Sequence, residues 1–299
     1  MNRPPLAKSF LIIALALGGC LTRKNTVAPE AYPVFMFQNG VGLNFGQAGC
    51  SLMDLGGIGR LCKKRELTPT DLFLQAGPAF SFLIPPAEEV PEKKVSEWRK
   101  KLLKVWELAG VSLYAVDAKD LEPSLTCFQS DVEDKKIPFI STNLRTLDGK
   151  TPFQAFHRMQ IKKRSFLFLS FSEPGKTGSD WKVIGFDEAL SAVASELQNL
   201  ETTQLVVLGN LNTQQRKQLA LLIKKPFAFL GGPLQEMNPT GWEAVSEMAW
   251  WAKAADLGRG VGLIYWDSAA NLNGLGRFVA QDLGKDLDAS NQCTDLLNK

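Results

Sequence analysis

Histidine is almost absent from this chain, since His157 is the only one in 299 residues. A catalytic triad needs a histidine oriented by specific partners, and a histidine metal centre needs more than one imidazole. Phe153, Phe156 and Met159 lie close to His157 in the sequence, which favours a packed or surface histidine over a catalytic one. The sequence therefore excludes any site built from several imidazoles.

A strong charge of either sign is also missing. The 34 Lys and Arg residues almost balance the 31 Asp and Glu residues, which gives a formal net charge of +3. Basic and acidic residues are interleaved, as in 92–94 and 97–101, and this pattern is typical of a solvated helix face. We therefore expect no nucleic-acid partner.

No apolar run is long enough to cross a bilayer, and the longest N-terminal one, residues 10–17, is too short. Basic residues precede this run, and two glycines followed by Cys20 come after it. This order resembles a bacterial lipoprotein signal peptide at 1–19, whose cleavage leaves Cys20 as a lipidated N-terminus. Several acyl chains anchor stably, because each buried CH₂ contributes about 0.8 kcal/mol. A plain secretory signal and an uncleaved buried helix are the alternatives.

Residues 20–31 are expected to join the lipid to a folded domain as a polar tether. Leu21 follows the cysteine where an aspartate would be a retention signal, by resemblance to enterobacterial sorting. We therefore expect a protein of the bacterial cell envelope, anchored in the outer membrane and facing the periplasm. The membrane is its first expected partner.

Few cysteines remain after such a cleavage: Cys50, Cys62, Cys127 and Cys293. Outside the cytoplasm they can form two disulfides in three possible pairings. Cys50 and Cys62 are close in sequence, so the favoured pairing is Cys50–Cys62 with Cys127–Cys293. Four buried, reduced thiols are the alternative. No pair has the C-x-x-C spacing of a zinc site.

Short apolar runs alternate with amphipathic stretches from residue 32 onward. Runs that are apolar throughout, such as 205–208, suit strands buried on both faces. The expected strands are 34–37, 72–75, 111–116, 137–141, 166–171, 181–186, 205–209, 227–230 and 261–266. This alternation predicts an α/β domain in which helices cover sheets.

Helical periodicity is expected at 55–65, 92–109, 188–199 and 214–225. Gly110 is a suitable stop for the second helix, and Asp187 and Thr213 are the expected caps of the last two. Trp242, Trp250 and Trp251 are expected in the core rather than on a ligand platform. Residues 269–299 lose periodicity and are expected to form an irregular tail held by Cys293.

Seven stretches follow one another in a recognisable order: 37–42, 56–61, 75–80, 110–122, 138–143, 206–211 and 230–235. For example, 138–143 is close to P-F-L-S-A-N and 230–235 to L-G-G-H-x-H. These motifs, in this order, resemble the catalytic domain of the 5′-nucleotidase-type (calcineurin-like) metallophosphoesterases. The likeness covers about residues 32–268. It implies a layered α/β/β/α sandwich of two mixed sheets flanked by helices.

The resemblance also implies a two-metal centre, in which carboxylates and imidazoles hold two cations that activate water and polarise a phosphoryl group. In this chain those ligand positions are vacated. Glycine, proline and alanine offer no side-chain ligand, and a lysine places a cation where a dication would bind. The vacated positions are Gly40, Gly42, Pro78, Ala118, Lys119, Asn210, Pro233 and Gln235. We expect no bound metal, no cofactor and no catalytic residue.

The sequence thus favours a lipid-anchored pseudoenzyme that acts as a binding or scaffolding module. Its ligand would be an unknown protein or a small anion, the latter held by Lys119, Asn39 and Asn210. The alternative is an active phosphoester hydrolase with a non-family metal site or relocated acids at 117, 120 and 122, which otherwise form a solvated loop. A spacer that uses only the fold is a third possibility.

Overall fold

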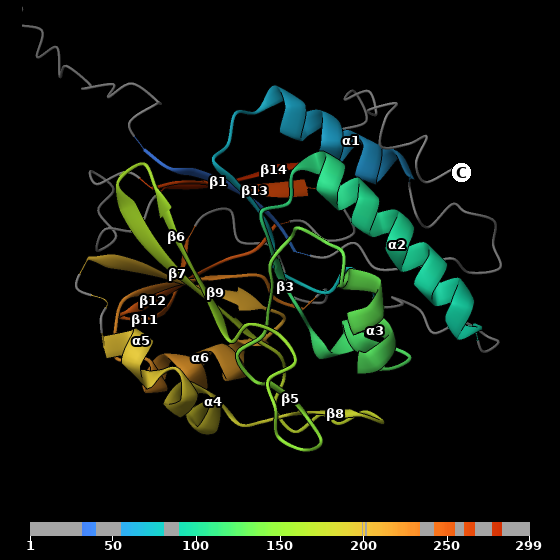
Figure 1. The fold of residues 1–299 in the computed structure, drawn as a ribbon. Helices are drawn as coiled ribbons and strands as arrows, with labels where there is room; N and C mark the ends of the chain where they lie inside the picture. Colours follow the sequence, from blue (N-terminus) through green and yellow to red (C-terminus); the bar gives the residue numbers. More distant parts are fainter. Residues whose placement is uncertain are drawn as a thin grey trace, which may run out of the picture. The chain divides into compact units, whose positions relative to one another are not determined.

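Two six-stranded sheets lie face to face in the computed structural model, and helices cover their outer faces (Figure 1). The structure describes residues 32–39, 55–80, 90–198, 200, 202–233, 242–254, 260–266 and 277–282. The chain divides into two units, Met1–Ala31 and Tyr32–Lys299, and every described residue lies in the second. The predicted layered α/β sandwich is confirmed for this unit.

The first sheet has the strand order β14-β13-β1-β2-β3-β4. The four strands from β1 to β4 are parallel, whereas β13 and β14 run antiparallel at one edge. Its strands are β1 (Val34–Gln38), β2 (Leu72–Gln75), β3 (Leu113–Ala115), β4 (Phe139–Ile140), β13 (Gly260–Tyr265) and β14 (Arg277–Asp282). Its helices are α1 (Leu55–Leu67), α2 (Glu92–Ala109), α3 (Leu125–Val132) and the short 3₁₀ helix η2 (Ala118–Leu121).

The second sheet has the strand order β11-β12-β10-β9-β7-β6, with four parallel strands between two antiparallel ones. Its strands are β6 (Phe156–Ile161), β7 (Arg164–Phe171), β9 (Thr203–Gly209), β10 (Phe227–Leu230), β11 (Glu243–Ser246) and β12 (Ala249–Ala252). The helices α4 (Phe186–Ala192), α5 (Ala194–Gln198) and α6 (Thr213–Leu222) lie on its outer side (Figure 1). A separate small sheet joins β5 (Leu144–Thr146) and β8 (Trp181–Val183).

The apolar core has three layers because successive residues of a strand point to opposite faces. In β1, Phe35 and Phe37 point between the two sheets, while Met36 packs under the helices of the first sheet. Phe35 meets Phe166 of the opposite sheet with ring centroids 4.8 Å apart. A third cluster lies between the second sheet and its helices, and it includes Leu219 of α6. Both sheets are therefore covered on both faces, which explains their continuous apolar strands.

The predicted helices 55–65, 92–109 and 214–225 are confirmed in position, whereas the one predicted over 188–199 is divided into α4 and α5 at Val193, and α3 was not predicted. Two of the predicted caps are also wrong. Helix α2 has the predicted bounds, and Gly110 closes it in the left-handed conformation with a φ of 73°. The cap of α4 is Gly185, while Asp187 lies inside the first turn. Asn212 caps α6 in a reciprocal capping box with Gln215, so Thr213 is already helical.

The expected irregular tail is wrong for part of its length. Residues 277–282 form β14, which pairs with all of β13 from Gly260 to Tyr265. The strand pattern of these six residues is too short to be recognised in the sequence without the pairing to β13. The strands β5, β6, β11 and β12 were also not predicted. Trp250 and Trp251 lie buried in β12, which confirms the core interpretation of that aromatic cluster.

The cysteines depart from the favoured pairing. Cys62 is disulfide-bonded, whereas Cys127 carries a free thiol. The predicted Cys127–Cys293 bond is therefore wrong, and the Cys127 sulfur lies instead 3.6 Å from an Arg99 nitrogen. The partner of Cys62 lies outside the described residues, as do Cys50 and Cys293, so Cys50–Cys62 stays a prediction. Within the described residues, no helix has the length and apolarity that a bilayer crossing requires.

Candidate functional site

The segments that follow the parallel strands of both sheets meet at one edge, which we call the carboxyl edge. An added Cβ on Gly77, after β2, would lie 1.8 Å from the backbone oxygen of Asn39, after β1. One on Gly231, after β10, would lie 2.2 Å from the oxygen of Gly209 and 2.8 Å from that of Ala76. The backbones are thus in direct contact across the two sheets. Ligands of open α/β folds bind at such strand ends.

Three consecutive backbone carbonyls at this edge, those of residues 231–233, each accept a hydrogen bond from a different side chain. The donors are Trp251 Nε1 at 2.5 Å, Asn39 Nδ2 at 2.9 Å and Lys253 Nζ at 2.6 Å, in that order along the segment. All three donors are buried, and Lys253 has no exposed surface. We call this arrangement the carbonyl clamp.

The loop after β3 is fixed by a buried carboxylate, Asp120. One oxygen of Asp120 accepts from the backbone N–H groups of Ala79 at 3.0 Å and Phe80 at 2.8 Å. The other accepts from the Tyr114 hydroxyl at 3.0 Å and from the Asp117 N–H at 3.1 Å. Asp120 therefore ties the loops after β2 and β3 together, and its four donors occupy both of its oxygens.

Burial dominates the ionisation of both acids in this loop. Burial, and next the charge of Asp117, raise the pKa of Asp120 to about 7 against the pull of its backbone donors. Burial likewise raises the pKa of Asp117, whose Oδ1 accepts from the backbone N–H of Lys119 at 2.9 Å. The solvated-loop interpretation is wrong for both acids, since only Glu122 and Lys119 are exposed. The two aspartates form the capping box of η2 and are buried.

The positions that the resemblance matches to metal ligands, where the structure describes them, lie in the segments after β2, β3, β9 and β10. Ala118 is buried, and its N–H donates to the hydroxyl of Ser172 at 3.0 Å. Lys119 is exposed, and Pro78, Asn210 and Pro233 are half-buried. Gly40, Gly42 and Gln235 lie outside the described residues.

Charged side chains border the loop of Lys119. Lys176 pairs with Glu173 at 2.6 Å, and this contact lowers the pKa of the Glu173 carboxyl. The charges of Lys119 and Lys176 oppose the burial effect on Asp117, so these groups lie near one another. The carboxyl edge therefore carries side chains of both charges near Lys119.

Sequence reasoning missed several residues that hold this edge. Ser172 N–H donates to Asn143 Oδ1 at 2.9 Å, and Asn143 Nδ2 donates back to the Ser172 oxygen at 2.8 Å. The asparagine ends the P-F-L-S-A-N-like stretch, which was a usable signal. Lys253 directly follows the fully apolar run 249–252, and a lysine in that position was a second usable signal in the sequence.

The described side chains do not fit a two-metal centre. No group of three or more His, Cys, Asp or Glu that could hold a metal ion occurs among them. Both carboxylate oxygens of Asp120 already accept hydrogen bonds from protein donors. The donor set therefore disagrees with the chemistry implied by the resemblance.

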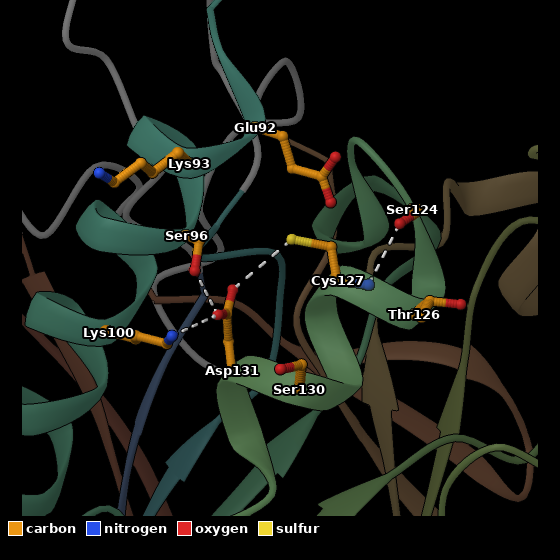
Figure 2. Close-up of a pocket in the computed structure, with 9 residues that line it drawn as sticks. All are labelled: Glu92, Lys93, Ser96, Lys100, Ser124, Thr126, Cys127, Ser130 and Asp131. Atoms are coloured by element: carbon orange, nitrogen blue, oxygen red, sulfur yellow. Dashed lines mark hydrogen bonds and ion pairs between the residues drawn. The ribbon is translucent and has the colours of Figure 1, made fainter.

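A groove of 490 Å³ lies between α2 and α3 (Figure 2). At its floor Asp131 accepts from Ser96 at 2.5 Å and pairs with the buried Arg99 at 2.6 Å. The Thr126 hydroxyl is bonded to Asp180. The groove is lined by Glu92, Lys93, Ser96, Lys100, Ser124, Thr126, Cys127, Ser130 and Asp131. Much of its polarity is thus satisfied within the protein.

No protein-family model matches this sequence, and no curated protein sequence is similar to it. Solved structures are similar. The calcineurin-like phosphoesterase YfkN of Bacillus subtilis has a TM-score of 0.67 at 11% identity, over 89% of this chain and 95% of its own. A 5′-nucleotidase precursor of Thermus thermophilus has a TM-score of 0.63 at 13% identity, over 89% and 58%. Sulfate thiohydrolase SoxB of Thermus thermophilus has a TM-score of 0.63 at 13% identity, and the match covers 82% of this chain and 46% of the SoxB chain.

These similarities establish a metallophosphoesterase-like fold, which confirms the architecture implied by the sequence motifs. At such low identities they show the fold alone. The chain spans about half the length of the nucleotidase and SoxB structures.

Proposed function

We propose that this chain is a metal-free relative of the phosphoesterases, a binding or scaffolding module held in the bacterial envelope by lipid on Cys20. One observation carries the proposal. Where strand ends of both sheets meet, the positions matching the metal ligands hold Pro78, Ala118, Lys119, Asn210 and Pro233. None of these provides a carboxylate or imidazole for a dication.

The edge remains ordered for recognition despite these substitutions. Its loops are joined by direct hydrogen bonds, such as Ala118 to Ser172 and Asn39 to the segment 231–233. Preformed sites bind with less entropic loss than flexible ones. The exposed Lys119 and the half-buried Asn210 offer donors to a small anion or to an acidic group of a partner protein.

Metal analysis of the purified full chain, combined with a phosphomonoester and phosphodiester screen, tests the proposal. We expect no stoichiometric Zn, Mn or Fe and no hydrolysis above buffer when these ions are added. An active phosphoesterase from the same fold, purified and assayed in parallel, controls for metal loss. Stoichiometric metal together with turnover would refute a metal-free binding role.

The lipid anchor has its own test. Radiolabelled palmitate should be incorporated into the wild-type chain in cells, and the protein should fractionate with the outer membrane. Cys20→Ala should abolish labelling and release the chain from membranes. Cys127→Ala is the matched control, because Cys127 is a free thiol whose loss should leave labelling intact. Unchanged labelling of Cys20→Ala would exclude lipidation at this residue.

The runner-up, a hydrolase with relocated acids, has less support. Asp120 is buried with four donors on its carboxylate, and Asp117 is buried beside it. A general base must reach its substrate. The same activity screen separates the two proposals, and Asp117→Asn would abolish turnover only in the second.

A further inference from the structure

The carbonyl clamp connects elements that no local sequence pattern joins. Asn39 comes from the end of β1 in the first sheet, whereas Trp251 and Lys253 come from β12 and its end in the second. All three donate to consecutive carbonyls of 231–233. The segment is thus fixed from both sheets at the place where they meet.

The clamped segment, 231–233, lies in the stretch that resembles L-G-G-H-x-H. The resemblance implies that the histidines of that motif bind metal ions. Here Pro233 occupies the first histidine position, and its carbonyl accepts from Lys253. We propose that the clamp does the positioning that metal–ligand bonds would do, with the buried Lys253 as one of its three donors. The edge is then preformed without any metal. This inference is independent of which ligand the module binds.

The chemistry of Lys253 supports this role. Lysine is almost never fully buried unless its ammonium group is paired or bonded, and here it is completely buried with a 2.6 Å bond to a carbonyl. Hydrogen bonds from charged donors are shorter and stronger than neutral ones.

The clamp extends to the loop after β9 through Trp251. The guanidinium of Arg216 lies 3.9 Å from the centre of the Trp251 ring, and its Nη1 donates to the backbone oxygen of Leu211 at 2.6 Å. Trp251 in turn donates to Gly231. The segments after β9 and β10 are therefore held in one network, which also positions Asn210 between Gly209 and Leu211.

Hydrogen exchange on the full chain in detergent tests the clamp. The amide of Gly231, bonded to Ala252 at 3.1 Å, reports on the segment. Lys253→Met should raise its exchange rate roughly tenfold or more, because the change removes a charged hydrogen bond and leaves a carbonyl unsatisfied. Lys217→Met, which alters an exposed lysine of α6, should leave the rate unchanged. Adding Mn²⁺, Zn²⁺ or a chelator should not alter the wild-type rate.

Trp251→Phe provides a milder second variant if Lys253→Met does not fold, since it removes the indole N–H and keeps an aromatic ring. It should also speed exchange at Gly231. Exchange indistinguishable from Lys217→Met in the folded variants would overturn the clamp, as would metal-dependent slowing in the wild type. Phosphatase activity without these signs would contradict the proposed function alone.

Discussion

The hydroxyl oxygen of Ser172 accepts a hydrogen bond at 3.0 Å from the backbone N–H of Ala118. Ala118 belongs to η2 after β3 of the first sheet, and Ser172 directly follows β7 of the second. Both residues are buried, so water cannot replace this bond at low cost. One serine thus joins the two sheets at the carboxyl edge.

Ser172→Ala should therefore destabilise the fold. It leaves the N–H of Ala118 buried without its acceptor, and an unsatisfied buried group costs about 1–3 kcal/mol. Urea denaturation measures the change in the free energy of unfolding. Ser130→Ala, which alters an exposed serine of α3, is the control and should change it by less than about 0.5 kcal/mol. Equal effects would mean that the bond does not join the sheets.

Arg99 should be among the most sensitive residues for stability. It is fully buried, lies 2.6 Å from the buried Asp131, and donates to the backbone oxygen of Glu122 at 2.5 Å. Arg99→Leu leaves the buried Asp131 carboxylate with only the exposed Lys100, 3.4 Å away, as a charged partner, and breaking a buried pair costs roughly 3–5 kcal/mol. The double variant with Asp131→Leu should lose less than the sum of the two single changes.

The matched comparison is the half-exposed pair of Arg158 and Glu196, whose atoms are 2.6 Å apart. Solvent screens that pair, so Arg158→Leu should cost only about 0–1 kcal/mol. Denaturation curves give the free energy of unfolding of the four variants: Arg99→Leu, Asp131→Leu, their double variant and Arg158→Leu. A strictly additive double variant at Arg99 and Asp131 would show that the two side chains act independently.

Asp120 should make stability depend on pH. Its pKa is about 7 in the folded chain, against about 3.9 for an unfolded aspartate. Because the folded state binds the proton more tightly, this group's contribution is complete below about pH 4 and is lost as pH rises towards about 7. The amplitude is roughly a few kcal/mol. Asp120→Asn should flatten this part of the pH profile, and Asp148→Asn, at an exposed aspartate, should not.

Thermal unfolding between pH 4 and 8 provides the measurement. Wild-type stability that rises through this window relative to Asp120→Asn would show that the four hydrogen bonds to the ionised carboxylate outweigh its burial. The neighbouring Asp117 also has a raised pKa through burial, so Asp117→Asn should reduce a smaller part of the same slope.

Much of the fold could be predicted because it depends on patterns close in sequence. Helix α2 could be bounded from its apolar stripe and Gly110, and β2 and β10 from continuous apolar runs. The order of short motifs then indicated the two-sheet architecture. Strand β14 could not be predicted, since its pattern gains meaning only from pairing with β13.

The site was less predictable because its contacts join distant parts of the chain. Asn39 and the carbonyl of Gly232 are 193 positions apart, and nothing local marks them as partners. Asp117 and Asp120 were misjudged as solvated, since charge in a short polar stretch usually faces water. Only the tertiary structure shows the Tyr114 hydroxyl and three backbone N–H groups converging on Asp120.

Gly231 offers the sharpest test of how closely the two sheets approach. Its φ of 116° is unfavourable for any side chain, and an added Cβ would lie 2.2 Å from the oxygen of Gly209 and 2.8 Å from that of Ala76. Backbone strain alone costs about 1–3 kcal/mol, and these clashes are with backbone atoms that cannot turn aside. Gly231→Ala should therefore destabilise the chain by roughly 3 kcal/mol or more. Gly185→Ala, with a φ of −62° and open space around it, should cost less than about 1 kcal/mol. If thermal unfolding ranked the two variants equally, the strand ends of the two sheets could not be as close as the structure has them.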